Sequence, residues 1–127
     1  MISLNEPKFD ENDKKAIKEC IESGWVSSVG KNIEKFENRI SNYTKSPYAI
    51  ACINGTSALH ISMVLSGVAS NTEVITPSLT FIATINAIKY SGANPIFMDS
   101  DHSYCINVNK TIEFIKNNTI IKKINNK

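Results

Sequence analysis

The feature that most limits the fold of this chain is a change of pattern at Asn54-Gly55. Residues 49–53 are almost all apolar and favour a β-strand, whereas an amphipathic segment starts directly after the glycine. This succession predicts a strand, a turn and the N-terminus of a helix. The first N–H groups of a helix lack intrahelical acceptors and carry partial positive charge, so the junction suits an anion such as phosphate.

Two hydroxyl side chains, Thr56 and Ser57, follow the turn and would add hydrogen-bond donors for a phosphate. The same residue types also cap helices when nothing binds, so an anion site and plain helix capping are both open. The segment has neither the Gly-x-Gly-x-x-Gly pattern of dinucleotide sites nor the Gly-Lys-Ser/Thr of P-loops. A phosphate site here would therefore be of another kind.

Helix and strand patterns alternate along the chain. The sequence predicts helices at 10–23, 32–43, 56–65, 80–91 and 108–117, and strands at 48–53, 73–76 and 95–99. The strand at 48–53 is expected to be buried on both faces because it is nearly all apolar. Such alternation predicts an α/β fold with a parallel sheet and outer helices. Ligands bind beyond the carboxyl ends of such strands, where the Gly-Thr-Ser turn, the turn at 78–81 and Asp99 would converge.

Composition argues against several classes of function. The net charge of +2 gives no strong electrostatic footprint for nucleic acid. The cysteines are far apart and form no Cys-x-x-Cys pair, and His60 has no second ligand one turn away, so no disulfide framework or metal site is expected. No signal peptide or membrane-spanning run is present. We therefore expect a cytoplasmic protein that binds neither nucleic acid nor membrane.

Five motifs carry a resemblance to a known family. They are Gly24-Trp25-Val26-Ser27-Ser28, Phe36-Glu37, the stretch from Asn54 to His60, the stretch from Val74 to Thr84, and Pro95 to Asp99. In this order and spacing they resemble the DegT/DnrJ/EryC1/StrS family of pyridoxal-phosphate-dependent nucleotide-sugar aminotransferases. The resemblance implies that residues 1–117 are the N-terminal part of a fold-type I large domain, mostly parallel sheet with flanking helices. Residues 118–127 are expected to form an unstructured or frayed tail.

The resemblance also implies a cofactor site. Gly55, Thr56 and Ser57 are similar to the turn that holds the phosphate of pyridoxal 5'-phosphate, and Phe81 is similar to the aromatic residue that stacks on its pyridine ring. One turn departs from the family, because Asn71-Thr72 stands where Gly-Asp is usual. That departure is expected to alter a turn without changing the chemistry.

On the substrate side, Trp25, Ser27 and Ser28 resemble a loop that approaches the sugar. The family function is transamination of a nucleotide-linked 4-keto-6-deoxy sugar for surface polysaccharides and glycans. The amino donor would be one such as glutamate, and each active site would lie at a homodimer interface. Residues 97–99 and 104–107 look similar to members on the routes to bacillosamine or legionaminic acid.

The Schiff-base lysine of the family, and the acidic residue that pairs with the pyridine nitrogen, lie beyond the stretch that this sequence matches. Lys89 falls within a predicted helix and does not match the lysine motif. The chain alone is therefore expected to be inactive or nearly so, as part of a truncated or split enzyme that pairs with a downstream fragment. Two alternatives stay open: a non-catalytic binding or dimer-partner protein that retains only the phosphate-binding turn, and a small α/β domain that binds another phosphate there.

Overall fold

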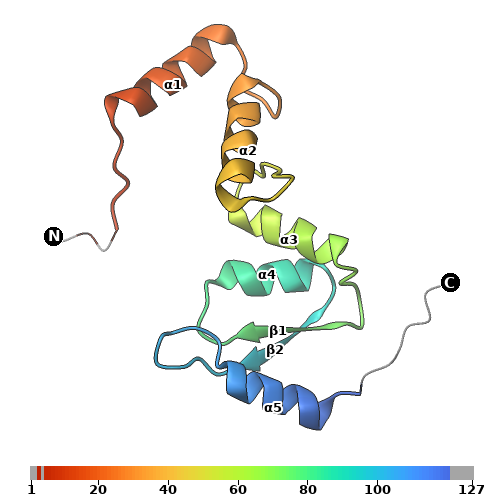
Figure 1. Cartoon of the computed structure of the whole chain (residues 1–127). Helices are drawn as coiled ribbons and strands as arrows, with labels where there is room; N and C mark the ends of the chain where they lie inside the picture. The colour runs from red at the N-terminus through yellow and green to blue at the C-terminus, as the bar shows by residue number, and fades with distance from the viewer. Residues whose placement is uncertain (1–2, 4, 121–127) are drawn as a thin grey trace. The chain divides into compact units, whose positions relative to one another are not determined.

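The computed structural model describes residues 3 and 5–120 (Figure 1). The chain divides into two compact units, Met1–Ala51 and Cys52–Lys127, called here unit 1 and unit 2. All the described residues that are fully buried belong to unit 2. The core of this chain therefore lies in unit 2, and each unit is considered by itself.

Unit 1 contains helices α1 (Glu11–Ser23) and α2 (Lys31–Thr44), which confirms both helices predicted there. Asp10 caps α1 by accepting hydrogen bonds from the N–H groups of Asn12 and Asp13, and the Asp13 carboxylate accepts the Asp10 N–H in return. The bonds from the Asp13 and Asn12 amides lower the pKa of Asp10. Gly24 ends the helix in the left-handed conformation, with φ 73°.

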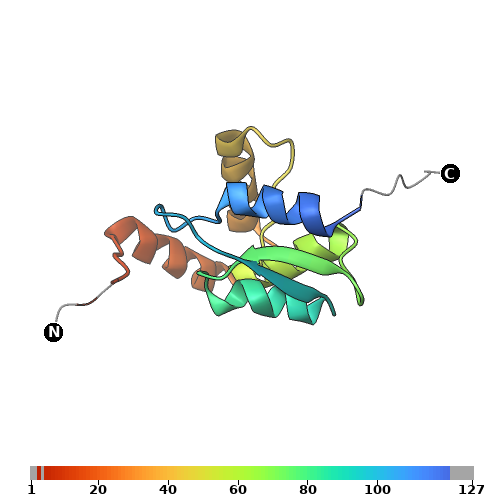
Figure 2. The same cartoon turned by 90° about the horizontal axis from the view of Figure 1, so that it is seen from below.

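Unit 2 is a small layered α/β structure. Its elements are α3 (Gly55–Leu65), β1 (Glu73–Pro77), α4 (Ile82–Tyr90), β2 (Asn94–Met98) and α5 (Val108–Asn118). The strands pair in parallel, with Glu73 opposite Asn94 and Pro77 opposite Met98. Helix α4 lies on one face of the sheet and α5 on the other, and α3 packs against α4 (Figures 1 and 2). The buried residues are Thr76, Ala87, Ile88 and Ala93.

The strand predicted at 48–53 is wrong, since these residues form no regular element. Tyr48, Ile50 and Ile53 are 82%, 80% and 91% exposed. A strand is stabilised only by the ladder of a neighbour, and within the described chain β1 and β2 pair with each other alone. The run of apolar residues therefore does not form a strand.

The predicted end of the last helix agrees with the structure to within a residue, because α5 ends at Asn118. Thr119 then caps the helix by donating its N–H to the Ile115 carbonyl. The rest of the predicted tail, residues 121–127, lies outside the described residues.

The turn that departs from the family pattern, at Asn71-Thr72, comes directly before β1. Asn71 has φ 68°, in the left-handed region that glycine adopts most easily. The Thr72 hydroxyl accepts the Ala69 N–H at 3.1 Å, as an aspartate carboxylate could, and the Thr72 carbonyl accepts the Asn94 N–H at 3.0 Å. These two hydrogen bonds hold the turn at the entry into β1.

Replacing Asn71 tests this reading of the turn. Asn71→Ala is expected to lower the free energy of unfolding by about 1 kcal/mol, because a Cβ without a local polar group is disfavoured at positive φ. Asn71→Gly should leave stability unchanged or slightly higher. Urea denaturation followed by circular dichroism measures both, and equal stability of the two variants would contradict the assignment.

Candidate functional site

The N-terminus of α3 is capped by a residue that sequence reasoning assigned no role. The Asn54 side-chain oxygen accepts the Ser57 N–H at 2.8 Å, and the Asn54 backbone carbonyl accepts the Ala58 N–H at 3.1 Å. The N–H groups of Gly55 and Thr56 have no acceptor among the described residues. Two donors at the positive end of the helix dipole are thus available to an anion.

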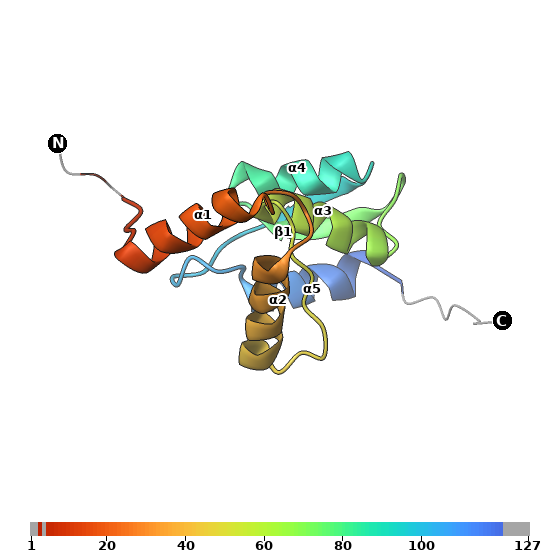
Figure 3. The same cartoon turned by 90° about the horizontal axis from the view of Figure 1, so that it is seen from above.

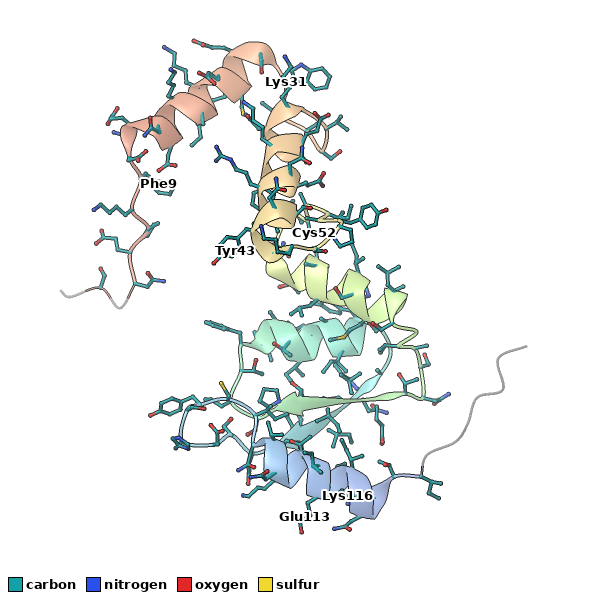
Figure 4. All side chains as sticks on the ribbon, viewed as in Figure 1. Phe9, Lys31, Tyr43, Cys52, Glu113 and Lys116 are labelled. Atoms are coloured by element: carbon teal, nitrogen blue, oxygen red, sulfur yellow. The ribbon has the colours of Figure 1, made fainter. Side chains whose placement is uncertain are left out.

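The two hydroxyls at this turn are also available. Neither Thr56 nor Ser57 uses its side-chain oxygen in a hydrogen bond with the part of the chain that the structure describes, and both residues are half-buried. The predicted alternative, that they serve only as caps, is wrong because Asn54 does the capping. Cys52, which Figure 4 labels, lies just before this turn.

Several predicted elements meet at one end of unit 2. Helices α3 and α4 run side by side in the same direction, so their N-termini lie at the same end (Figures 1 and 3). Strands β1 and β2 finish at that end as well (Figure 1). There the Ser78 N–H donates to the Met98 carbonyl at 2.9 Å. The turn at 78–81 and Asp99 thus follow the carboxyl ends of β1 and β2, whereas the Gly-Thr-Ser turn follows no strand.

Phe81 is the N-cap residue of α4 and has no side-chain capping bond. Its side chain is 89% exposed, and with Leu79 and Thr80 it lines an open hollow in the surface. Phe81 lies at the start of α4, the end of unit 2 at which the carboxyl ends of β1 and β2 also lie (Figure 1). The ring is free to stack on a flat ligand.

An ion pair balances charge at the same edge. The Lys110 Nζ lies 2.6 Å from a carboxylate oxygen of Asp99, the residue that follows β2. This hydrogen bond and the accompanying charge attraction lower the pKa of Asp99 and raise the pKa of Lys110. Asp99 is thus ionised at neutral pH, but its charge is matched, which reduces repulsion of an anion bound nearby.

The residues predicted on the substrate side belong to unit 1. Trp25 is 61% exposed, and its loop follows Gly24, whose carbonyl accepts the Val26 N–H at 3.1 Å. A hollow of about 740 Å³ lies beside it, lined by both helices and by the loop, Ser27 included. An exposed tryptophan over an open, largely apolar hollow is consistent with a contact surface.

Two side chains weighed in the sequence have local partners. The rings of His60 and Tyr90 meet edge to face, with centroids 5.9 Å apart. The Lys89 Nζ donates to Asn94 Oδ1 at 3.2 Å, at the C-terminal end of α4, whereas Phe81 lies at the N-terminal end.

Residues 3 and 5–120 contain no group of three or more acidic, histidine or cysteine side chains placed to hold a metal ion. None of the helices described there is long and apolar enough to cross a membrane.

Comparison with known proteins gives a consistent result. The sequence profile of the DegT/DnrJ/EryC1/StrS aminotransferase family matches residues 7–124. GDP-perosamine synthase of Escherichia coli O157:H7 is 45% identical over 101 residues, which are 80% of this chain and 28% of that protein. The chain therefore spans little more than a quarter of this relative.

Solved structures are similar over the same part. A DegT DnrJ EryC1 StrS aminotransferase from Brucella abortus has a TM-score of 0.73 at 32% identity, over 83% of this chain and 29% of that one. NtdA from Bacillus subtilis, solved with bound cofactor PMP, has a TM-score of 0.64 at 34% identity, over 69% of this chain and 20% of its own. The α/β arrangement of this chain thus occurs in aminotransferases of this type.

Proposed function

This chain belongs to the DegT/DnrJ/EryC1/StrS aminotransferase family, and from that premise we propose that it takes part in transamination of a nucleotide-linked 4-keto-6-deoxy sugar with pyridoxal 5'-phosphate as cofactor. The name of the similar E. coli protein, a GDP-perosamine synthase, supports a nucleotide-linked sugar as substrate. The pathway would be one of surface polysaccharide or glycan synthesis. The comparisons do not favour the alternative of a non-catalytic binding protein.

One observation carries the cofactor proposal. Because Asn54 caps α3, the N–H groups of Gly55 and Thr56 and the hydroxyls of Thr56 and Ser57 are all free to donate to the same anion. A phosphate dianion accepts several such bonds, and each is strengthened by the charge. The residues present thus fit the phosphate end of pyridoxal phosphate.

The remaining residues would orient the rest of the cofactor. Phe81 would lie against the pyridine ring, where its apolar face and offset stacking hold a flat molecule without a covalent bond. When bound, pyridoxal phosphate supplies the carbonyl that takes up an amino group and the ring that withdraws electrons. Lys89 would stay outside this site, held by Asn94 at the other end of α4.

Further parts of the proposal rest on the family. We assign Trp25, Ser27 and Ser28 to the substrate side, since their loop is exposed next to an open hollow. A donor such as glutamate, a homodimer and a cytoplasmic location would accompany the enzyme function. The bacillosamine- or legionaminic-acid-type assignment remains a prediction within the broader class of nucleotide sugars.

Titration of the purified chain tests the cofactor proposal. Absorbance should show that pyridoxal phosphate binds at least roughly tenfold more tightly than pyridoxal. Only pyridoxal phosphate carries the phosphate group that the turn would hold. Inorganic phosphate should compete with it. After borohydride reduction, peptide mapping should show no specific adduct at Lys89.

Two results would contradict this proposal. Equal affinity for pyridoxal phosphate and pyridoxal would remove the phosphate turn from the site. A stoichiometric adduct on Lys89 would place the covalent bond at the wrong end of α4.

A further inference from the structure

The connection between β1 and α4 is fixed on both sides of Phe81. On the strand side, the Ser78 N–H donates to the Met98 carbonyl at 2.9 Å. On the helix side, the hydroxyls of Thr80 and Thr84 lie 3.0 Å apart and form a hydrogen bond. This second bond spans the first turn of α4, so it encloses Phe81 between its two ends.

The Phe81 ring has little else to hold it. Its side chain is 89% exposed, so packing contributes little to its position. As N-cap residue, Phe81 has extended backbone angles (φ −63°, ψ 143°) and no oxygen with which to cap the helix. Its direction is therefore set mainly by the backbone at residues 80–84. There the Thr84 N–H donates to the Phe81 carbonyl at 3.1 Å, and the Thr80–Thr84 bond is the only side-chain hydrogen bond that these five residues make within the described chain.

We propose that the Thr80–Thr84 hydroxyl pair positions Phe81 for stacking on the cofactor ring. This inference rests on the proposed function and deepens it. A flat ligand that met a mobile ring would have to order it on binding, at a cost in affinity. A hydroxyl bond across the first turn fixes the backbone beforehand, so that the ring already faces the ligand. Thr80 and Thr84 are thus positioning residues and do not touch the cofactor.

The test uses the whole chain without ligand first. In Thr80→Val, which keeps the branched shape and removes the hydroxyl, the order parameter of the Phe81 amide from ¹⁵N relaxation should fall from about 0.85 to below about 0.6. Thr84→Val should give the same loss from the other side of the bond. Thr80→Ser, which keeps the hydroxyl, should restore the wild-type value.

Ligand titrations then connect this motion to binding. Thr80→Val should weaken the binding of pyridoxal phosphate roughly fivefold, which is the cost of ordering one side chain. The affinity for inorganic phosphate should stay the same, because phosphate would not touch the Phe81 ring. Thr111→Val is the matched control: the Thr111 hydroxyl donates to the carbonyl of Asn107, the N-cap residue of α5, so its removal should change neither measurement.

The two proposals fail separately. A rigid Phe81 amide in both valine variants would overturn the positioning role, whatever the chain binds. Loss of order in the variants, together with a wild-type chain that binds pyridoxal phosphate no better than pyridoxal, would support the positioning role and overturn the cofactor proposal.

Discussion

The double variant Thr56→Val/Ser57→Ala is expected to bind pyridoxal phosphate about 100-fold more weakly than the wild-type chain. Each hydroxyl is free of other partners and would donate to a dianion. A hydrogen bond to a charged group contributes about 1.5 kcal/mol or more, so losing two of them corresponds to a factor of about 100. The Gly55 and Thr56 N–H groups remain, so weak binding should persist. Absorbance or calorimetric titration gives both dissociation constants.

A control from the same helix separates this loss from a general effect of removing hydroxyls. The Ser62 hydroxyl donates to the Ala58 carbonyl at 2.8 Å within α3, so Ser62→Ala should bind the cofactor as tightly as wild type. Pyridoxal, which has no phosphate, should bind all three proteins alike. Wild-type affinity of the double variant for pyridoxal phosphate would show that the phosphate is held elsewhere.

Helices were predictable because their signals are local. The start of α1 could be read from Asp10 followed by acidic residues, and its end from Gly24, since caps depend on neighbours only a few residues away. The strands of the sheet could be predicted for the same reason: the short β-prone runs at 73–76 and 95–99 are bounded by turns, and the strands observed at 73–77 and 94–98 differ by one residue at their ends. The alternation of elements then predicted their parallel pairing, which the structure confirms.

The error at 48–53 shows what a local pattern cannot supply. An apolar run indicates a strand only if another strand lies beside it, and that neighbour comes from elsewhere in the chain or assembly. Tyr48, Ile50 and Ile53 have the composition of a buried strand and the exposure of a loop. Nothing in the run itself distinguishes the two outcomes.

In the candidate site, too, some features could be predicted from local sequence and others could not. The Gly-Thr-Ser turn and the carboxyl edge could be predicted, because helix N-termini and parallel sheets have general rules for binding. The side chain that caps α3 could not be predicted, because Asn54, Thr56 and Ser57 are all good candidates. The hydroxyl bond between Thr80 and Thr84 had a signal, four-residue spacing at a helix start, but that spacing alone does not separate a bond from two solvated side chains.

The variant with the largest expected effect on stability is Gly92→Ala, at the turn between α4 and β2. Gly92 has φ 79°, and a Cβ there would lie 2.7 Å from Ser70 Oγ and 3.3 Å from the Ser70 backbone nitrogen. The backbone cannot easily retreat, because the next residue, Ala93, is fully buried and donates its N–H to the Ile88 carbonyl at 3.2 Å. Backbone strain and overpacking together should lower the free energy of unfolding by about 3 kcal/mol.

For a unit of this size, that loss corresponds to a fall in melting temperature of roughly 15 °C, measurable by calorimetry. Gly67→Ala is the matched control, because Gly67 has φ 78° but nothing within 4 Å of its Cβ position, so only the strain of about 1 kcal/mol applies. In the double variant Ser70→Ala/Gly92→Ala, the stability lost through the clash with the Ser70 hydroxyl should be recovered. The stability lost through the contact with the Ser70 backbone and through backbone strain should remain lost. If Gly92→Ala cost no more than Gly67→Ala, the close approach of Ser70 would not constrain this turn. The proposed cofactor site lies at the opposite end of α4, so the folded fraction of Gly92→Ala should bind pyridoxal phosphate with wild-type affinity.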